Sequence, residues 1–105
     1  MTRETDRTTL VRARLGGAVV VDVREPAEYD EGQVPGADNL PLAALPARVA
    51  ELPDDQRVSV VCARGNRSAS ATDLLVAAGK DAVSVRGGTH AWVEAGRDVT
   101  SGPTP

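Results

Sequence analysis

The sequence has very few aromatic residues: it contains no phenylalanine, one tryptophan and one tyrosine among 105 residues. A surface that stacks single-stranded nucleic acid needs several aromatic side chains, so the composition excludes a binder of that kind. The formal net charge of −3 also argues against binding to the phosphate backbone of nucleic acids. The core must therefore be built from valine, leucine and alanine.

The sequence also lacks long apolar runs, and it has only one cysteine, Cys62. No segment approaches the ~20 apolar residues that a membrane-spanning helix needs. The first residues, MTRETDRTTL, lack the apolar centre of a signal peptide. A single cysteine cannot form an internal disulfide or a multi-cysteine metal site. We therefore expect a soluble protein of the reducing cytoplasm, with no membrane or nucleic-acid partner.

Three short runs of β-branched residues predict the strands of a parallel sheet. Each run has the length of a strand and is apolar at nearly every position, as in a central strand buried on both faces. A more polar stretch at residues 37–41 predicts a fourth strand at an edge. The three runs are residues 19–23 (VVVDV), 58–61 (VSVV) and 82–85 (AVSV).

Helical patterns lie between these runs, so the sequence predicts a small doubly wound α/β fold with a mostly parallel sheet and helices on both faces. Thr9 is expected to cap the first helix, and Gly79 to end the clearest one, in which Leu74, Leu75 and Ala78 share one side. Pro46 is expected to divide the third helical segment. The expected helical segments are residues 9–15, 26–29, 42–52, 68–78 and 88–95.

The chain has the length of one domain. No internal repeat and no long linker divides it. We expect a single domain over residues 9–99. The short polar segments at residues 1–8 and 100–105 are expected to be flexible termini.

The only cysteine follows the apolar run at residues 58–61 directly, and this position predicts a reactive thiol. Ligands of parallel sheets bind beyond the carboxyl ends of the strands. After the loop at residues 63–67 (ARGNR) we expect a helix whose amino terminus points back at the sulfur. Unpaired amides there, and two arginines, favour a thiolate, so the pKa of Cys62 should lie below the free value of about 8.5. The alternative, a buried inert cysteine, fits poorly with the charged and polar residues that follow.

Four arginines fall at or just past the expected carboxyl ends of strands. Arg67 is expected to close the loop around the sulfur. Arg64 is expected to point outward and to attract anions. Arg24 and Arg86 are expected to make surface ion pairs with nearby glutamates. The arginines are Arg24, Arg64, Arg67 and Arg86, and the glutamates are Glu25, Glu28 and Glu31.

Together these segments resemble the single-domain rhodanese (thiosulfate sulfurtransferase) family. The matching motifs occur in the family's order, and the resemblance extends over residues 9–99. No single motif decides the resemblance, but their conjunction is highly specific. The motifs are DVRE at residues 22–25, PGADNLPL at 35–42, the loop with four residues between Cys62 and Arg67, and GGTHAW at 87–92.

The resemblance implies that Cys62 attacks the outer sulfur of thiosulfate or another sulfane-sulfur donor and carries it as a persulfide. A second nucleophile, such as cyanide, a small thiol or a protein, then removes the sulfur. The resemblance implies no metal and no organic cofactor. It also implies that the loop amides bind the persulfide anion. The implied site comprises Cys62 as nucleophile, surrounded by Ala63, Arg64, Gly65, Asn66, Arg67 and Ser68.

Other functions stay open at this point. One is a persulfide carrier with little activity toward thiosulfate. Another is a rhodanese-like interaction module, although such modules usually lack the cysteine that this chain keeps. A phosphatase or arsenate reductase is a weaker alternative, because the related phosphatases use a longer C-x5-R loop.

Several residues near these motifs are interpreted as structural. Asp22 ends an apolar run, so burial would require partners such as backbone amides or Arg24. His90 is the only histidine, and a preformed thiolate needs no general base. Trp92 is expected to anchor the core. The family often has histidine where Gln33 stands, and we assign Gln33 no catalytic role.

Overall fold

A computed structural model describes residues 2–102 of the chain. Its centre is a five-stranded sheet in which every strand pairs in parallel with its neighbours. The strands, in chain order, are β1 (Glu4–Thr5), β2 (Val19–Asp22), β3 (Asp38–Asn39), β4 (Val58–Val61) and β5 (Ala82–Val85). Their order across the sheet is β1-β5-β4-β2-β3.

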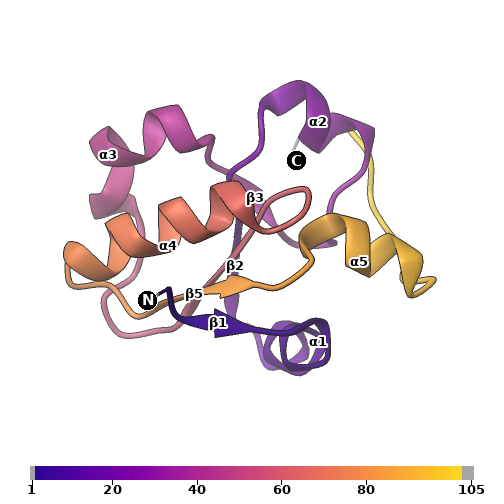
Figure 1. Ribbon diagram of the computed structural model, residues 1–105, viewed down its shortest axis with the longest axis horizontal. Coiled ribbons are helices and arrows are strands. Elements are labelled where there is room, and N and C mark those ends of the chain that lie inside the picture. The colour runs from indigo at the N-terminus through magenta and orange to yellow at the C-terminus, as the bar shows by residue number, and fades with distance from the viewer. Residues whose placement is uncertain (1, 103–105) are drawn as a thin grey trace.

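Helices cover both faces of the sheet (Figure 1), which confirms the predicted fold class. On one face, Leu10 and Trp92 pack against Val61 and its neighbours. On the other face, Leu45 and Leu75 pack in a second cluster of buried residues. The helices are α1 (Arg7–Leu15), α2 (Pro26–Glu31), α3 (Leu45–Arg48), α4 (Asn66–Ala77) and α5 (Gly88–Glu94), with 3-10 turns at Leu42–Ala44 and Val49–Glu51.

The central strands agree with the sequence prediction. Every residue of β4 and β5 is buried, as their unbroken apolar pattern predicts. Strand β2 ends one residue earlier than predicted, at Asp22, and the edge strand β3 is reduced to two residues.

The helices show two differences from the prediction. Pro46 does divide its segment, because α3 is short and lies between two 3-10 turns. In α4, however, Ala78 is exposed, and the buried side contains Ser68, Ala71, Thr72 and Leu75 instead. Among residues 2–102 no helix is both long and apolar enough to cross a membrane.

The beginning of the chain differs from the sequence prediction. The sequence predicts that residues 1–8 lie outside the domain, but Glu4–Thr5 pairs with β5 and forms the edge of the sheet. The first helix starts at Arg7, and its cap is Asp6, whose carboxylate accepts a hydrogen bond from the Thr9 amide at 2.8 Å. Thr9 therefore lies within the first turn and is not the cap.

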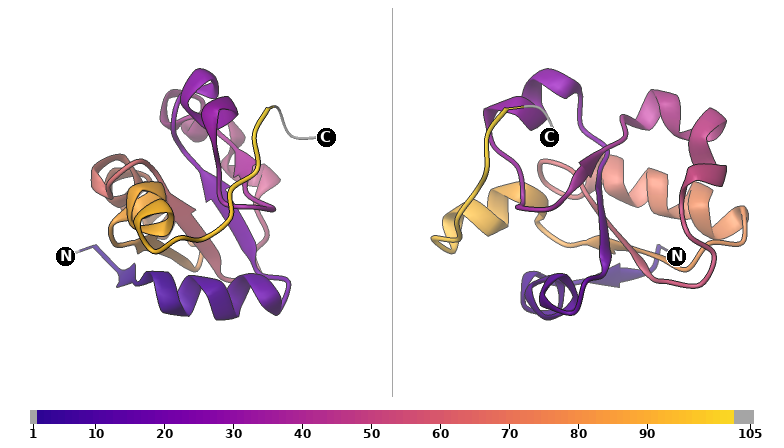
Figure 2. Two further views of the ribbon diagram at one scale, coloured as in Figure 1. Left: turned by 90° about the vertical axis from the view of Figure 1, so that its right-hand side faces the viewer. Right: turned by 180° about the vertical axis from the view of Figure 1, so that it is seen from behind.

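The last described residues, up to Gly102, also lie against the domain. In both views of Figure 2 the last described segment runs from α5 to a position beside α2. Thr100 forms an antiparallel bridge with Gln33, so this residue belongs to the packed structure. Residues 103–105 of the expected flexible terminus lie outside the described residues.

Candidate active site

Cys62 directly follows β4 and is almost completely buried, with 1% of its surface exposed. The chain turns sharply after it, and α4 begins at Asn66, earlier than the sequence predicted. Gly65 caps this helix with a φ of 115°, a conformation that side-chain-bearing residues rarely adopt. The predicted arrangement of strand, thiol, tight loop and helix is therefore present. Ala63 is half-buried, whereas the side chains of Arg64 and Asn66 are exposed.

The Cys62 sulfur contacts polar groups of the loop and of α4. The amide of Gly65 donates a hydrogen bond to Sγ at 3.1 Å. The Ser68 hydroxyl lies 3.4 Å from Sγ and 2.8 Å from the hydroxyl of Ser84 on β5. Sequence reasoning missed Ser84. Ser84 could have been identified as the polar residue in an otherwise apolar strand, because a buried polar side chain needs a hydrogen-bond partner.

The surroundings of Cys62 have opposing effects on its pKa. Burial raises the pKa of the thiol and is the largest single effect. The Ser68 hydroxyl and the backbone amides of Ser68, Gly65 and Arg64 lower it, and together they outweigh burial, so the pKa of Cys62 lies below its ordinary value. The direction agrees with the sequence prediction. The main stabilising groups are hydrogen-bond donors, however, and arginine charges are not among the largest causes.

We expect the alkylation rate of Cys62 by a small neutral reagent to show an inflection below the pH of about 8.5 that is typical of a free cysteine. The thiolate is the reacting form, and the donors around Sγ favour it at lower pH. In Ser68→Ala the inflection should move upward, because the first of the lowering groups is lost. The alkylation rate is measured at a series of pH values from acid to alkaline, with the alkylated fraction read by intact mass. The series gives the inflection for the native protein and for Ser68→Ala. An inflection at or above the free value would contradict the arrangement of the loop.

The amino terminus of α5 fixes the cysteine loop from its other side. The amides of Thr89 and His90 donate hydrogen bonds to the carbonyl oxygens of Cys62 and Ala63 at 2.8 and 2.9 Å. Gly88 permits this approach, because a Cβ atom there would lie 2.3 Å from the Cys62 carbonyl oxygen. The sequence showed the double glycine but did not indicate this contact.

Arg67 does not enclose the sulfur with its side chain. Its guanidinium group makes a bidentate ion pair with Glu28 of α2, with N–O distances of 2.6 and 2.8 Å. The hydrogen bonds from Arg67 are the main reason why the pKa of Glu28 is lowered to about 2. Arg67 thus ties the start of α4 to α2, a contact that depends on the packing of distant segments.

Neither Arg24 nor Arg86 makes the expected ion pair with Glu25, Glu28 or Glu31, but Arg24 does make the contact expected for Asp22. Arg24 pairs with the buried Asp22, with its Nη2 atom 2.7 Å from a carboxylate oxygen, and also donates to the Gly32 carbonyl at 2.8 Å. Asp22 thereby has the partner that its burial required. Arg86 lies 3.7 Å from Glu4 of β1, a residue that the prediction had placed outside the domain.

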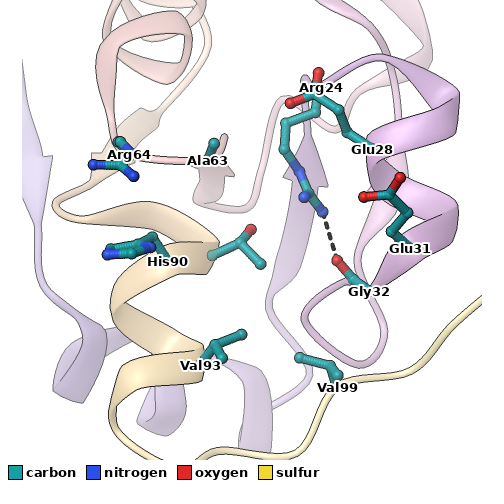
Figure 3. A pocket seen from close by; sticks show the side chains of 10 residues that line it. Arg24, Glu28, Glu31, Gly32, Ala63, Arg64, His90, Val93 and Val99 are labelled. Atoms are coloured by element: carbon teal, nitrogen blue, oxygen red, sulfur yellow. Dashed lines mark hydrogen bonds between the residues drawn. The ribbon is translucent and has the colours of Figure 1, made fainter.

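A cleft of about 500 Å³ opens beside the cysteine loop (Figure 3). Its lining includes Ala63 and Arg64 of the loop. Arg64 is exposed and, within residues 2–102, makes no ion pair, so it is available to an anion. His90 also lines the cleft, and its Nε2 atom lies 3.1 Å from the Glu94 carboxylate. Trp92, as predicted, is a core residue with 2% of its surface exposed.

The sequence profile of the rhodanese-like domain matches residues 8–95 of this chain. A sulfurtransferase of Allochromatium vinosum is 35% identical over 104 residues, which cover 96% of this chain and 97% of the relative. The chain belongs to the rhodanese family. It is a single rhodanese-like domain with one buried cysteine and is homologous to proteins named as sulfurtransferases.

Solved rhodanese structures agree with this assignment. A rhodanese-related protein of Thermoplasma volcanium superimposes with a TM-score of 0.87 at 35% identity, covering 93% of this chain and 97% of the other. A thiosulfate sulfurtransferase of Pseudomonas aeruginosa gives a TM-score of 0.89 at 33% identity. The match covers 98% of this chain but 21% of that protein, so the rhodanese fold here corresponds to one part of a longer polypeptide.

Proposed function

We propose that this rhodanese-like protein is a sulfurtransferase that moves a sulfane sulfur from thiosulfate, or a related donor, to an acceptor through a persulfide on Cys62. The observation that carries the proposal is the set of polar groups that stabilise the Cys62 thiolate. The Gly65 amide lies 3.1 Å from Sγ, and the Ser68 hydroxyl and further loop amides lower the pKa of the thiol. Such a site stabilises an anionic sulfur before and after sulfur loading.

In the first step the Cys62 thiolate attacks the outer sulfur of thiosulfate. A bond forms between Sγ and that sulfur, the sulfur–sulfur bond of thiosulfate breaks, and its electron pair leaves with sulfite. Two negative charges on the donor and one on Sγ become two on sulfite and one on the persulfide. Arg64, at the mouth of the cleft, is suited to attract the donor anion.

In the second step an acceptor attacks the outer sulfur of the persulfide. With cyanide, a carbon–sulfur bond forms, the bond to Sγ breaks, and the products are thiocyanate and the Cys62 thiolate. The negative charge returns to Sγ, where the loop amides already point. The same groups therefore serve both half-reactions, and the cycle needs no separate base.

Steady-state formation of thiocyanate from thiosulfate and cyanide tests this proposal. Turnover that saturates with thiosulfate is expected. Sulfur loading without turnover would instead support a persulfide carrier, and the absence of both would contradict the proposal. We propose thiosulfate-type anions, thiols and cyanide as partners, and the cytoplasm as the compartment.

Arg67 is expected to act by positioning the loop and not by touching the donor. Replacing Arg67 with alanine, or Glu28 with glutamine, should lower kcat/KM for thiosulfate by about fivefold, because a partly exposed ion pair contributes up to ~1 kcal/mol. Arg67→Lys should also be impaired, since lysine keeps the charge but loses the two-pronged contact. The double variant should be no worse than either single one.

The glutamine variant at position 28 separates this account from direct binding of the donor. Glu28→Gln keeps Arg67 but releases it from its carboxylate partner. If Arg67 contacted the donor anion, this change would raise kcat/KM for thiosulfate. Near-normal activity of Arg67→Lys, or a defect of Arg67→Ala that shrinks at high salt, would likewise contradict the positioning role.

A further inference from the structure

The segment that follows α5, residues 98–102, forms a strap that is fixed at both ends. At its start, the indole nitrogen of the buried Trp92 donates to the Asp98 carbonyl at 2.7 Å. At its end, the Gly102 amide donates to the Asp30 carbonyl at 2.8 Å. The strap therefore connects α5 with α2, the two helices that flank the cleft, as Figure 2 shows from two sides.

Gln33 holds the centre and end of this strap. Its backbone amide and carbonyl exchange hydrogen bonds with Thr100, at 2.9 and 3.0 Å. Its side-chain nitrogen donates to the Gly102 carbonyl at 3.1 Å. Gln33 is buried, with 4% of its surface exposed, so these contacts are shielded from water. Gln33, at a position where the family often has histidine, thus has a structural role here.

Val99 lies between the two anchored ends and lines the cleft. The Cβ position of Gly32, which caps the end of α2, is 3.6 Å from a methyl group of Val99, so the strap rests directly on this helix end. Val93 of α5 lines the same region. Val93 is 55% exposed and Val99 is 40% exposed. In Figure 3 they lie together at the end of the cleft opposite Ala63.

The cleft thus has two chemically different ends. Arg64 and Ala63 mark the end near the cysteine loop, and the two valines form an apolar wall at the other. A cleft of about 500 Å³ is much larger than cyanide or thiosulfate needs. The charged lining of the cleft is balanced, with two arginines and two glutamates (Arg24, Arg64, Glu28 and Glu31), so it favours neither an anionic nor a cationic tail.

We propose that the strap, through Val99, makes this protein prefer, as sulfur acceptors, organic thiols whose uncharged carbon chain is long enough to cross the cleft. This rests on the proposed sulfur transfer. The acceptor thiol attacks the outer sulfur of the persulfide while its carbon chain lies against Val99 and Val93. A sulfur–sulfur bond to the acceptor forms, the bond to the Cys62 sulfur breaks, and that electron pair restores the thiolate. The proton stays on the product persulfide.

The test measures kcat/KM for mercaptoethanol, mercaptobutanol and mercaptohexanol with thiosulfate as donor. In the native protein kcat/KM should rise about twofold with each added methylene. This rise corresponds to half of the free energy gained when a methylene is fully buried. In Val99→Ser this rise should vanish, while kcat/KM for cyanide stays within twofold of the native value. Val76→Ser is the matched control, because Val76 on α4 is 39% exposed and lies outside the lining of the cleft. It should keep the native dependence on chain length.

A second variant tests the strap itself. Thr100→Pro removes the amide that donates to Gln33, and it should also flatten the dependence on chain length, with cyanide turnover retained. An unchanged chain-length dependence in both strap variants, or no such dependence in the native protein, would overturn the proposal. If the native protein showed no turnover with cyanide, that result would instead contradict the sulfurtransferase function on which this proposal rests.

Discussion

Replacement of Cys62 by serine is expected to abolish thiocyanate formation, with a fall in kcat of at least about a thousandfold. Cys62 is the only cysteine of the chain, so no second thiol can accept sulfur in its place. A serine hydroxyl is not ionised near neutral pH and cannot form a persulfide. The measurement is steady-state turnover with thiosulfate and cyanide at saturating concentrations of both.

The folded state of Cys62→Ser should be preserved, which makes the result interpretable. Serine has nearly the shape of cysteine, and its hydroxyl can still accept the hydrogen bond from the Gly65 amide. Urea denaturation and circular dichroism check this directly. Turnover that survives in the serine variant would mean that sulfur transfer does not pass through Cys62.

Gly88→Ala is expected to have the largest effect on stability, a loss of more than about 3 kcal/mol in the free energy of unfolding. The φ of Gly88 is 55°, and an added Cβ would lie 2.3 Å from the Cys62 carbonyl oxygen and 2.8 Å from that of Ala63. These are backbone atoms, so they cannot rotate away as a flexible side chain would. Relief requires α5 to move off the cysteine loop, so sulfur transfer should fall as well.

Gly79→Ala provides the control for the cost of the backbone conformation alone. Gly79 has a φ of 88°, but nothing lies within 4 Å of its Cβ position. Its replacement should cost only about 1 kcal/mol, the usual penalty for a left-handed alanine. Urea denaturation of both variants gives the comparison. Equal destabilisation would show that contact with the loop carbonyls is unimportant.

The parts that the sequence predicted are those set by local pattern. Strands β4 and β5 are buried on both faces, so every residue in them is subject to the same selection for small or apolar side chains. The place of Cys62 follows from the end of β4 and the glycine-containing turn after it. These features depend on a few consecutive residues, and periodicity and turn chemistry reveal them.

The parts that the sequence did not predict depend on contacts between distant segments. Strand β1 has only two residues and a polar composition, and it is a strand because β5 offers a free edge. Arg67 pairs with Glu28 because packing brings α2 beside the start of α4. Gln33 and the strap likewise lie far apart in the sequence but meet in the fold. No local pattern carries this information, because many alternative pairings of charges were equally compatible with the sequence.

The most direct test of the central claim is the intact mass of the protein after incubation with thiosulfate and removal of excess donor. The account predicts a gain of one sulfur atom per chain, lost again on addition of cyanide with release of one equivalent of thiocyanate. Tandem mass spectrometry should place the added sulfur on Cys62. A native protein that gains no mass with thiosulfate or any other sulfane-sulfur donor, while its thiol stays free and reactive to alkylation, would contradict the account.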